Sequence, residues 1–287
     1  SILARHRSDG VNGEARDDTG AGRAARFALE AFVIAGAVLP LYLLAKQSVS
    51  PELETFAWPP HWLPHRLTLD HFISVFEVNE LRGAILRSLA VAAISAAIAT
   101  TLGAMLAHAM ARSAIAQCVG FSTVSGIRLL PMIAVAIPLG TILATLGVYD
   151  SPSGIGLAIV HAAIAIPTAA LTIYASFAAI PLEIEEAAWI DGASPLRIFL
   201  TIDLPMARAA IATALILCFI LSWDEFGFAL LVQQTNRTLP PLLYYYTVFG
   251  NVGPASALAL LMMIPAVIVV VALGPSLRGA LTAGSSR

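Results

Sequence analysis

The chain has 287 residues, of which 58% are hydrophobic and only 12% are charged. A soluble globular domain has about 25% charged residues, so the composition excludes a soluble enzyme, a nucleic-acid-binding protein and a disordered chain. The formal net charge of −2 gives no surplus of positive charge for nucleic acid. The two cysteines, Cys118 and Cys218, lie in apolar surroundings without ligand spacing, which predicts small buried hydrophobic residues.

Apolar runs follow one another along the chain and predict an all-α, polytopic membrane protein. A helix needs about 20 apolar residues to cross a hydrocarbon core about 30 Å thick. The clearest runs, 88–111, 151–182 and 254–273, contain no Asp, Glu, Lys or Arg. The run at 129–146 is short, and Pro131 and Pro138 predict a kinked or broken helix there. The six predicted spans are 27–45, 84–111, 129–146, 155–180, 209–232 and 254–273.

Both ends of the chain are predicted to be polar tails outside the transmembrane domain 27–273. Residues 1–26 contain five arginines, and residues 274–287 follow the last span. Because arginines precede it, the first run could be a cleavable signal peptide. Its length and the lack of a clear small-x-small cleavage site favour a retained helix.

Arginine placement predicts the orientation of the spans. Segments on the side of the two termini hold eleven arginines, whereas the opposite segments hold three arginines and one lysine. Positive residues concentrate on the cytoplasmic side, so both termini are predicted to lie in the cytoplasm. The predicted outer segment 46–83 contains Trp58 and Trp62 with three histidines. These histidines, His61, His65 and His71, fit no standard metal spacing, so an aromatic interfacial anchor is favoured over a metal loop.

The longest predicted cytoplasmic loop, 181–208, is the most polar stretch between spans, yet it keeps apolar residues. Gly192 interrupts the segment, and Ser194 followed by Pro195 is typical of a helix start. Pro205 ends or kinks the second helix. The loop therefore predicts two short helices around a glycine turn, the second amphipathic. Such a helix could insert into a groove on a partner or lie on the lipid surface.

The same loop carries a resemblance to a known family. Glu186-Ala187-Ala188, three residues, Gly192, nine residues and Ile202-Asp203-Leu204-Pro205 match the pattern EAA-x3-G-x9-I-x-LP at every fixed position. This is the EAA loop of ABC importer permeases. Segments 68–112, 137–151, 222–232 and 281–284 are also similar to carbohydrate-importer permeases of the maltose-system type.

Two departures from that family pattern limit what it implies about the solute. The family usually has Asn-Ser where this chain has Arg87-Ser88, and Trp-Asn-Glu-Phe where it has Trp223-Asp224-Glu225-Phe226. The resemblance implies import of a sugar or sugar derivative by alternating access. Another small polar solute, such as a polyamine or a phosphonate, stays open as the alternative. A self-sufficient secondary transporter is disfavoured, because no inverted repeat and no charge network across the spans is visible.

The resemblance implies a type I ABC importer permease fold in the plasma (inner) membrane of a prokaryote. Its partners would be the lipid bilayer, a second homologous permease, two copies of an ATP-binding subunit, and an extracytoplasmic solute-binding protein or lipoprotein. No nucleic acid is expected. The residues implied to dock on the ATPase are Glu185, Glu186, Ala187, Ala188, Asp191, Gly192, Ala193, Ser194, Pro195, Phe199, Leu204 and Pro205.

The chain is predicted to have no enzymatic activity of its own. Its only lysine, Lys46, is followed by Gln47, so the phosphate-binding pattern GxxxxGK[ST] is absent from the sequence. No metal or cofactor is predicted in this chain, and ATP and Mg are implied to be used by the partner ATPase subunits.

Candidate solute and binding-protein contacts lie at the predicted outer side. Asp224 and Glu225 lie between Trp223 and Phe226 within the fifth span, about eight residues, or ~12 Å, from its outer end. Ionisable groups at that depth are usually functional. The alternative is that the helix ends at Ser222 and these residues form an interfacial cap. Tyr244, Tyr245 and Tyr246 in the outer loop 233–253 are predicted to contact the binding protein. His108 and His161 have no carboxylate three or four residues away, which predicts packing or pore residues.

Overall fold

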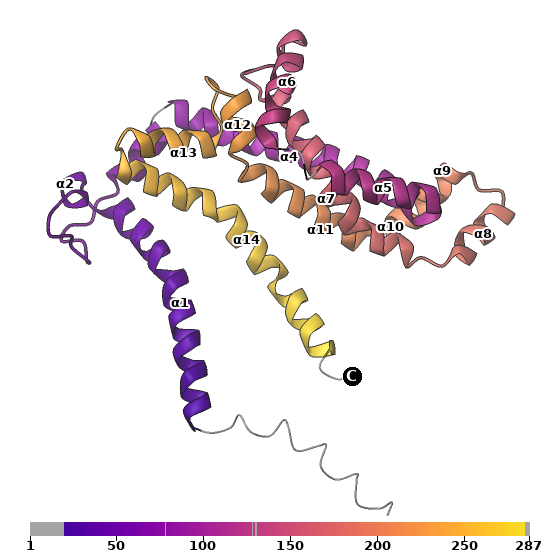
Figure 1. Ribbon diagram of the computed structural model, residues 1–287, viewed down its shortest axis with the longest axis horizontal. Coiled ribbons are helices and arrows are strands. Elements are labelled where there is room, and N and C mark those ends of the chain that lie inside the picture. The colour runs from indigo at the N-terminus through magenta and orange to yellow at the C-terminus, as the bar shows by residue number, and fades with distance from the viewer. Residues whose placement is uncertain (1–19, 78, 128, 130, 285–287) are drawn as a thin grey trace, which may run out of the picture.

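The described residues of the computed structural model, 20–77, 79–127, 129 and 131–284, form helices and contain no strand. Figure 1 shows an elongated assembly of long and short helices. The prediction of an all-α fold is confirmed for this part of the chain. Most of the predicted N-terminal tail, residues 1–19, and residues 285–287 of the predicted C-terminal tail lie outside the described residues.

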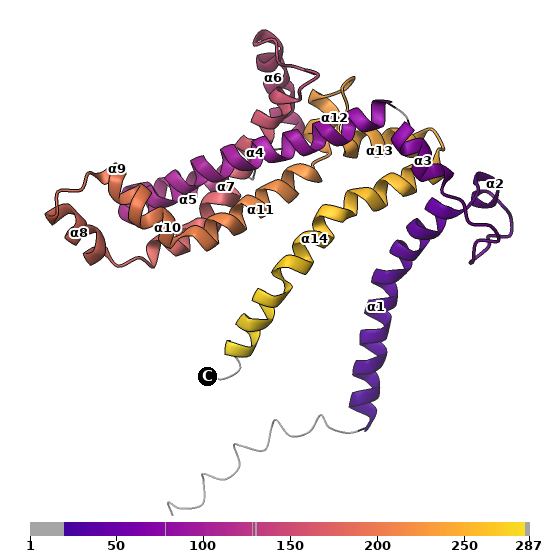
Figure 2. The same ribbon diagram turned by 180° about the vertical axis from the view of Figure 1, so that it is seen from behind.

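Three helices pack lengthwise to form the central bundle: α4 (Asn79–Arg112), α7 (Ile155–Ala178) and α11 (Arg208–Trp223). They run side by side in Figures 1 and 2. Small residues allow this approach, because a Cβ atom built on Gly103 of α4 would lie 2.5 Å from the Cβ of Ala169 on α7. The buried alanines that α4 and α7 contribute to this core are Ala96, Ala99, Ala104, Ala107, Ala165 and Ala169.

Two long helices leave the bundle at one end and slant away from it: α1 (Gly20–Val49) and α14 (Val252–Gly284). None of the most apolar window of α1 is buried against the rest of the chain. Phe27 and Phe32 are among its exposed aromatic side chains. A contiguous apolar surface of this kind is typical of a helix covered by lipid or by another subunit.

The predicted third span corresponds to a helix that is shorter than the hydrocarbon core. The region contains two helices of 14 residues each, α5 (Ala114–Ile127) and α6 (Met132–Thr145). Each helix is about 21 Å long, which is shorter than the hydrocarbon core. Pro131 immediately precedes α6, and its lack of an N–H and its fixed φ make it a natural break between two helices. Helix α5 occupies a segment that was predicted as a cytoplasmic loop.

The predicted fifth span is interrupted as well. Helix α11 ends at Trp223, and α12 (Gly227–Val232) begins after a short break. By length and hydropathy, four helices among the described residues could cross a membrane. They are Gly22–Val49, Glu80–Arg112, Ile155–Ala178 and Val252–Val269. A fifth arises if Pro195–Met206 and Arg208–Trp223, which are bent by 78°, are counted as one span. Six spans therefore remain a prediction.

The remaining helices lie at the two ends of the bundle. Helices α2 (Glu52–Thr55), α3 (Asp70–Glu77) and α13 (Leu239–Val248) lie at one end. At the other end lie α8 (Leu182–Ile190), α9 (Pro195–Ile198), the π-helical turn η1 (Phe199–Asp203) and α10 (Leu204–Met206). Of the three histidines in segment 46–83, His71 is buried, and its Nε2 lies 2.9 Å from the carbonyl oxygen of Ser50, so it has a packing role.

Candidate functional site

The loop 181–208 folds as two short helical arms around a glycine turn at one extremity of the molecule (Figure 1). Gly192 has φ +81°, a conformation that a residue with a Cβ adopts only with strain, and its N–H donates to the carbonyl of Trp189 at 2.9 Å. Ser194 caps the second arm, because its hydroxyl accepts from the backbone N–H of Arg197 at 3.3 Å. The local conformation therefore agrees with the two predicted helices and their turn.

One face of this loop is exposed and partly apolar. Ile190 is 88% exposed and Leu196 is 66% exposed. The side chain of Glu186 is exposed as well. The other predicted docking residues that are exposed are Ala187, Asp191, Gly192, Ser194, Pro195 and Pro205, while Ala188, Ala193, Phe199 and Leu204 are half-buried. An acidic group among exposed apolar side chains is suited to contact with a partner protein.

The opposite face is buried and ionic. Arg112, in the last turn of α4, donates from Nε to Oε1 of Glu185 at 2.6 Å and from Nη1 to the carbonyl of Phe177 at 3.0 Å. The side chain of Glu185 is only 7% exposed. The expected contact of Glu185 with an ATPase therefore does not agree with this arrangement, because the carboxylate faces α4 rather than the exposed face.

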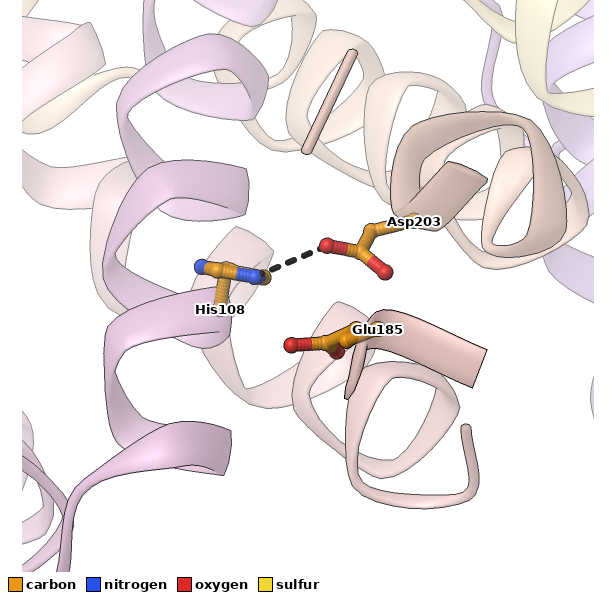
Figure 3. A group of neighbouring side chains, drawn as sticks. All are labelled: His108, Glu185 and Asp203. Carbon is orange, nitrogen blue, oxygen red and sulfur yellow. Dashed lines mark hydrogen bonds and ion pairs between the residues drawn. The ribbon is translucent and has the colours of Figure 1, made fainter. Parts of the chain in front are cut away.

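A second polar contact lies one turn earlier on α4. The Nε2 atom of His108 lies 3.0 Å from Oδ2 of Asp203, which is fully buried in η1 (Figure 3). The His108 ring also packs edge-on against Phe199, with centroids 4.9 Å apart. Sequence reasoning missed this pair, because it searched for partners of His108 only within one helical turn, and Asp203 is 95 residues away.

His108, Glu185 and Asp203 bring one potential metal-ligand atom each to within 4.8 Å of one another. They form the one such group found among the described residues. The guanidinium of Arg112, already bonded to Glu185, places a positive charge beside the two carboxylates. The cluster therefore contains a cation supplied by the chain itself.

At the other end of α11, the structure separates the four residues that were predicted as a solute pathway. Trp223 is 6% exposed, and its indole N–H donates to the carbonyl of Met262 at 2.9 Å, so its ring belongs to the core. Asp224 is exposed and lines a cavity of about 260 Å³ between α11, α13 and α14. Phe226 is exposed, and the centroid of its ring lies 5.3 Å from that of Tyr244. Asp224 and Phe226 thus remain the accessible candidates.

Glu225 acts as a helix cap. Its carboxylate accepts from the backbone N–H groups of Phe228 at 2.9 Å and Ala229 at 3.0 Å, at the start of α12. It also lies 3.0 Å from Nε2 of His161, whose Nδ1 lies 2.7 Å from the hydroxyl of Ser222. Glu225 thus caps the following helix α12, and α11 ends at Trp223, one residue beyond the Ser222 of the alternative, while the interfacial position of these residues stays a prediction. The partner of His161 could not be found within one turn of its own helix.

Hydrogen bonds tie together the loops at this end, which we call the far-end loops, residues 147–154 and 233–253. Arg87 of α4 donates to the carbonyl oxygens of Pro152 at 3.0 Å and Arg237 at 2.6 Å. Asp150 accepts from the backbone N–H groups of Thr235 and Asn236. Burial alone would raise the pKa of Asp150, but the hydrogen bonds from Asn236 and Thr235 outweigh it and hold this pKa below its ordinary value of 3.8. Arg87, which departs from the family pattern, therefore has a structural role in joining the two far-end loops.

The three consecutive tyrosines of segment 233–253 do not share one environment. Tyr244 and Tyr245 are exposed, and the Arg237 guanidinium lies 4.5 Å over the ring of Tyr245. Tyr246 packs against the core formed by α3, α4, α13 and α14. Only the first two offer surface to a partner protein.

The fold and the loop 181–208 together define a permease subunit of an ABC importer. The chain belongs to the family of binding-protein-dependent transport system inner membrane components, which matches residues 99–278. As a member of this family, it is a multi-pass membrane protein that works with a binding protein.

Individual relatives resemble the chain over nearly its whole length. It is 30% identical over 277 residues to the trehalose transport system permease protein SugB of Mycobacterium tuberculosis, covering 93% of this chain and 98% of that relative. It is 26% identical to the sulfoquinovosyl glycerol transport system permease protein SmoH of Agrobacterium fabrum, covering 92% and 93%. A crystal structure of a bacterial ABC transporter that imports the acidic polysaccharide alginate has the same fold, with a TM-score of 0.70, 19% identity and coverage of 90% and 98%.

Proposed function

We propose that the chain is the permease subunit of an importer for a sugar or sugar derivative, driven by separate ATPase subunits that dock on the loop 181–208. The observation that carries the proposal is the exposed face of this loop, with Glu186 among apolar side chains at one extremity of the molecule. The sugar-related solutes of its relatives, trehalose and sulfoquinovosyl glycerol, support the class of solute.

The proposed assembly contains two permeases, two ATPases and an external binding protein. Each chain has one EAA loop and no phosphate-binding loop in its sequence, so two permeases would offer one docking site to each ATPase. ATP and Mg would be held by the ATPases. Both termini would lie in the cytoplasm of a prokaryotic cell, and six segments would cross the plasma membrane. The unburied apolar surface of α1 supports a lipid or subunit contact.

In this proposal, ATP-driven closure of the ATPases moves the docking loop. The movement passes into α11, which follows the loop directly, and opens the pathway alternately to each side. Solute would pass the cavity lined by Asp224, where a carboxylate can accept hydrogen bonds from hydroxyl groups.

The decisive test of docking is Glu186→Ala in the complete transporter, co-expressed with its partner subunits. Loss of a charge-assisted contact worth about 1.5–3 kcal/mol should weaken ATPase binding about ten- to a hundredfold. Glu183→Ala is the matched control, because Glu183 is exposed on the same helix but lies outside the EAA pattern. Wild-type ATPase co-purification and solute-stimulated hydrolysis by Glu186→Ala would overturn the docking role.

The solute class is tested by uptake into proteoliposomes that contain the complete transporter and its binding protein. A labelled disaccharide such as trehalose should accumulate in the presence of ATP. Accumulation of a polyamine or a phosphonate, with no uptake of di- or monosaccharides, would leave the transport mechanism in place and overturn the sugar assignment.

A further inference from the structure

We infer that the end of α4 holds the docking loop by a double clamp, the Arg112–Glu185 ion pair and the His108–Asp203 hydrogen bond, and that this clamp transmits loop movement to the membrane helices. The inference rests on the proposed docking function of the loop. In it, Arg112 and His108 are positioning residues, because they touch neither solute nor nucleotide.

The first contact joins three elements through one side chain. Arg112 of α4 reaches both Glu185 of α8 and the carbonyl of Phe177 near the end of α7. Its own side chain is 15% exposed. Because the guanidinium is planar and donates in two directions, it fixes the angle between α8 and the bundle more tightly than a single contact could.

The second contact holds the other arm of the same loop. His108 precedes Arg112 by four residues, so the two side chains lie on one face of α4. His108 forms a hydrogen bond with Asp203 in η1, while Arg112 donates to Glu185 in α8. The two helical arms on either side of Gly192 are therefore tied to one helix face. Figure 3 shows Glu185 and Asp203, one from each arm, beside His108.

Burial makes these contacts costly to break. A buried ion pair adds little net stability compared with well-packed apolar residues, but removal of one partner leaves an uncompensated charge. Asp203 is fully buried, and its Oδ1 has no hydrogen-bond partner among the described residues. The clamp therefore cannot open without leaving buried polar groups unpaired, and this property suits transmission of a displacement.

Helix α4 provides the path to the opposite end of the molecule. Arg87 and Arg112 lie 25 residues apart on this one helix, which corresponds to about 37 Å. At the distant position, Arg87 holds the carbonyls of Pro152 and Arg237 in the far-end loops. A displacement of the docking loop would therefore reach the side proposed for the binding protein through one continuous helix.

The test uses the complete transporter in proteoliposomes with the double variant Arg112→Met and Glu185→Met. This replacement removes the ion pair without stranding a charge and conserves most of the side-chain volume. ATPase co-purification and ATP hydrolysis should persist, whereas solute uptake per ATP hydrolysed should fall about two- to thirtyfold, the range in which positioning residues alter coupling between sites. Glu183→Met on the same helix is the control and should leave uptake per ATP unchanged.

A second variant covers the case in which the double variant fails to insert. Arg112→Lys keeps the charge but loses the two-directional contact, and uptake per ATP should fall in the same direction. Unchanged uptake per ATP in whichever of these variants inserts would overturn the inference.

Two further outcomes separate this inference from other roles of the cluster. Loss of ATPase binding in these variants would overturn the positioning role, since it would make the pair part of the docking surface itself. The docking proposal, by contrast, is tested separately by the Glu186→Ala variant. A stoichiometric bound transition metal, found by elemental analysis of the purified wild-type complex, would also overturn the clamp, because the metal and not Arg112 would then join the acids.

Discussion

Two neighbouring glutamates of the docking loop have opposite environments. Glu185 is buried against Arg112, whereas Glu186 is exposed. Consecutive residues of an α-helix are rotated by about 100°, so adjacent identical residues can face a partner and the protein interior. The sequence alone assigned both to docking, because it contained no information about which face of α8 would meet α4.

Gly192 provides the prediction at the scale of single residues. No atom lies within 4 Å of a Cβ built at Gly192, so a substitution there acts only through the backbone at φ +81°. Gly192→Ala should therefore cost about 1–2 kcal/mol of local strain and reduce ATPase binding moderately. Gly192→Pro should abolish coupling, because proline fixes φ near −65° and removes the N–H that bonds to Trp189.

The measurement is ATPase co-purification together with solute-stimulated ATP hydrolysis in the complete transporter. Gly250→Ala imposes the same kind of backbone strain in a far-end loop, at φ +79°, and should leave ATPase binding unchanged. Normal coupling in Gly192→Pro would show that the turn does not set the angle between the two arms.

At the scale of helices, the positions of the apolar runs were predicted better than the breaks between helices. The runs at 84–111 and 155–180 correspond to α4 (Asn79–Arg112) and α7 (Ile155–Ala178) within a few residues. Hydrophobicity sustained over such lengths leaves few alternatives to a buried or membrane-spanning helix. The break at Pro131 was predicted from the proline itself, whereas the break at 224–226 was only an open alternative, because periodicity gives little information about a capped helix start.

The seam between α4 and α7 gives the prediction for helix packing. A larger side chain at Gly103 would meet the Cβ of Ala169 and the backbone nitrogen of Ala170, which cannot move independently of α7. Gly103→Leu should therefore destabilise the purified protein by about 1–3 kcal/mol. Gly36→Leu on α1 is the control, because no atom lies within 4 Å of its Cβ position.

Thermal unfolding in detergent measures the difference between these variants. The Gly103→Leu protein should unfold several degrees below the wild type, and the Gly36→Leu protein close to it. Equal midpoints for the two variants would mean that the α4–α7 seam can widen without loss of stability.

For the whole molecule, the sequence predicted what lies at each end but not how the ends are connected. The docking loop was found from its motif, and the far-end loops from the order of the spans. The connections between them, Arg112 with Glu185, His108 with Asp203 and Arg87 with Arg237, join residues 73, 95 and 150 positions apart. Pairs at such distances depend on which helices become neighbours, and no local pattern in one sequence encodes that.

The proposed orientation of the molecule in the membrane has a direct test. With Cys118 and Cys218 replaced by alanine, single cysteines at Leu196 and Tyr244 place reporters on exposed side chains at opposite ends. A membrane-impermeant thiol reagent added to intact cells should label Tyr244→Cys at once and Leu196→Cys only after the membrane is opened. The reverse labelling pattern would contradict cytoplasmic termini.

The π-helical turn at Phe199–Asp203 gives a physical reason for the number of residues between Gly192 and Ile202 in the loop motif. In this turn the N–H of Leu204 bonds to the carbonyl of Phe199, five residues back, instead of four as in a regular helix. One additional residue is accommodated without lengthening the arm by a full turn. Without it, every side chain that follows would be rotated by about 100° about the helix axis, and Asp203 would no longer face His108. The nine-residue interval between Gly192 and Ile202 therefore fixes the direction in which the later side chains of the second arm point. Deleting a single residue inside it would rotate those side chains about the helix axis and leave the residues themselves almost unchanged.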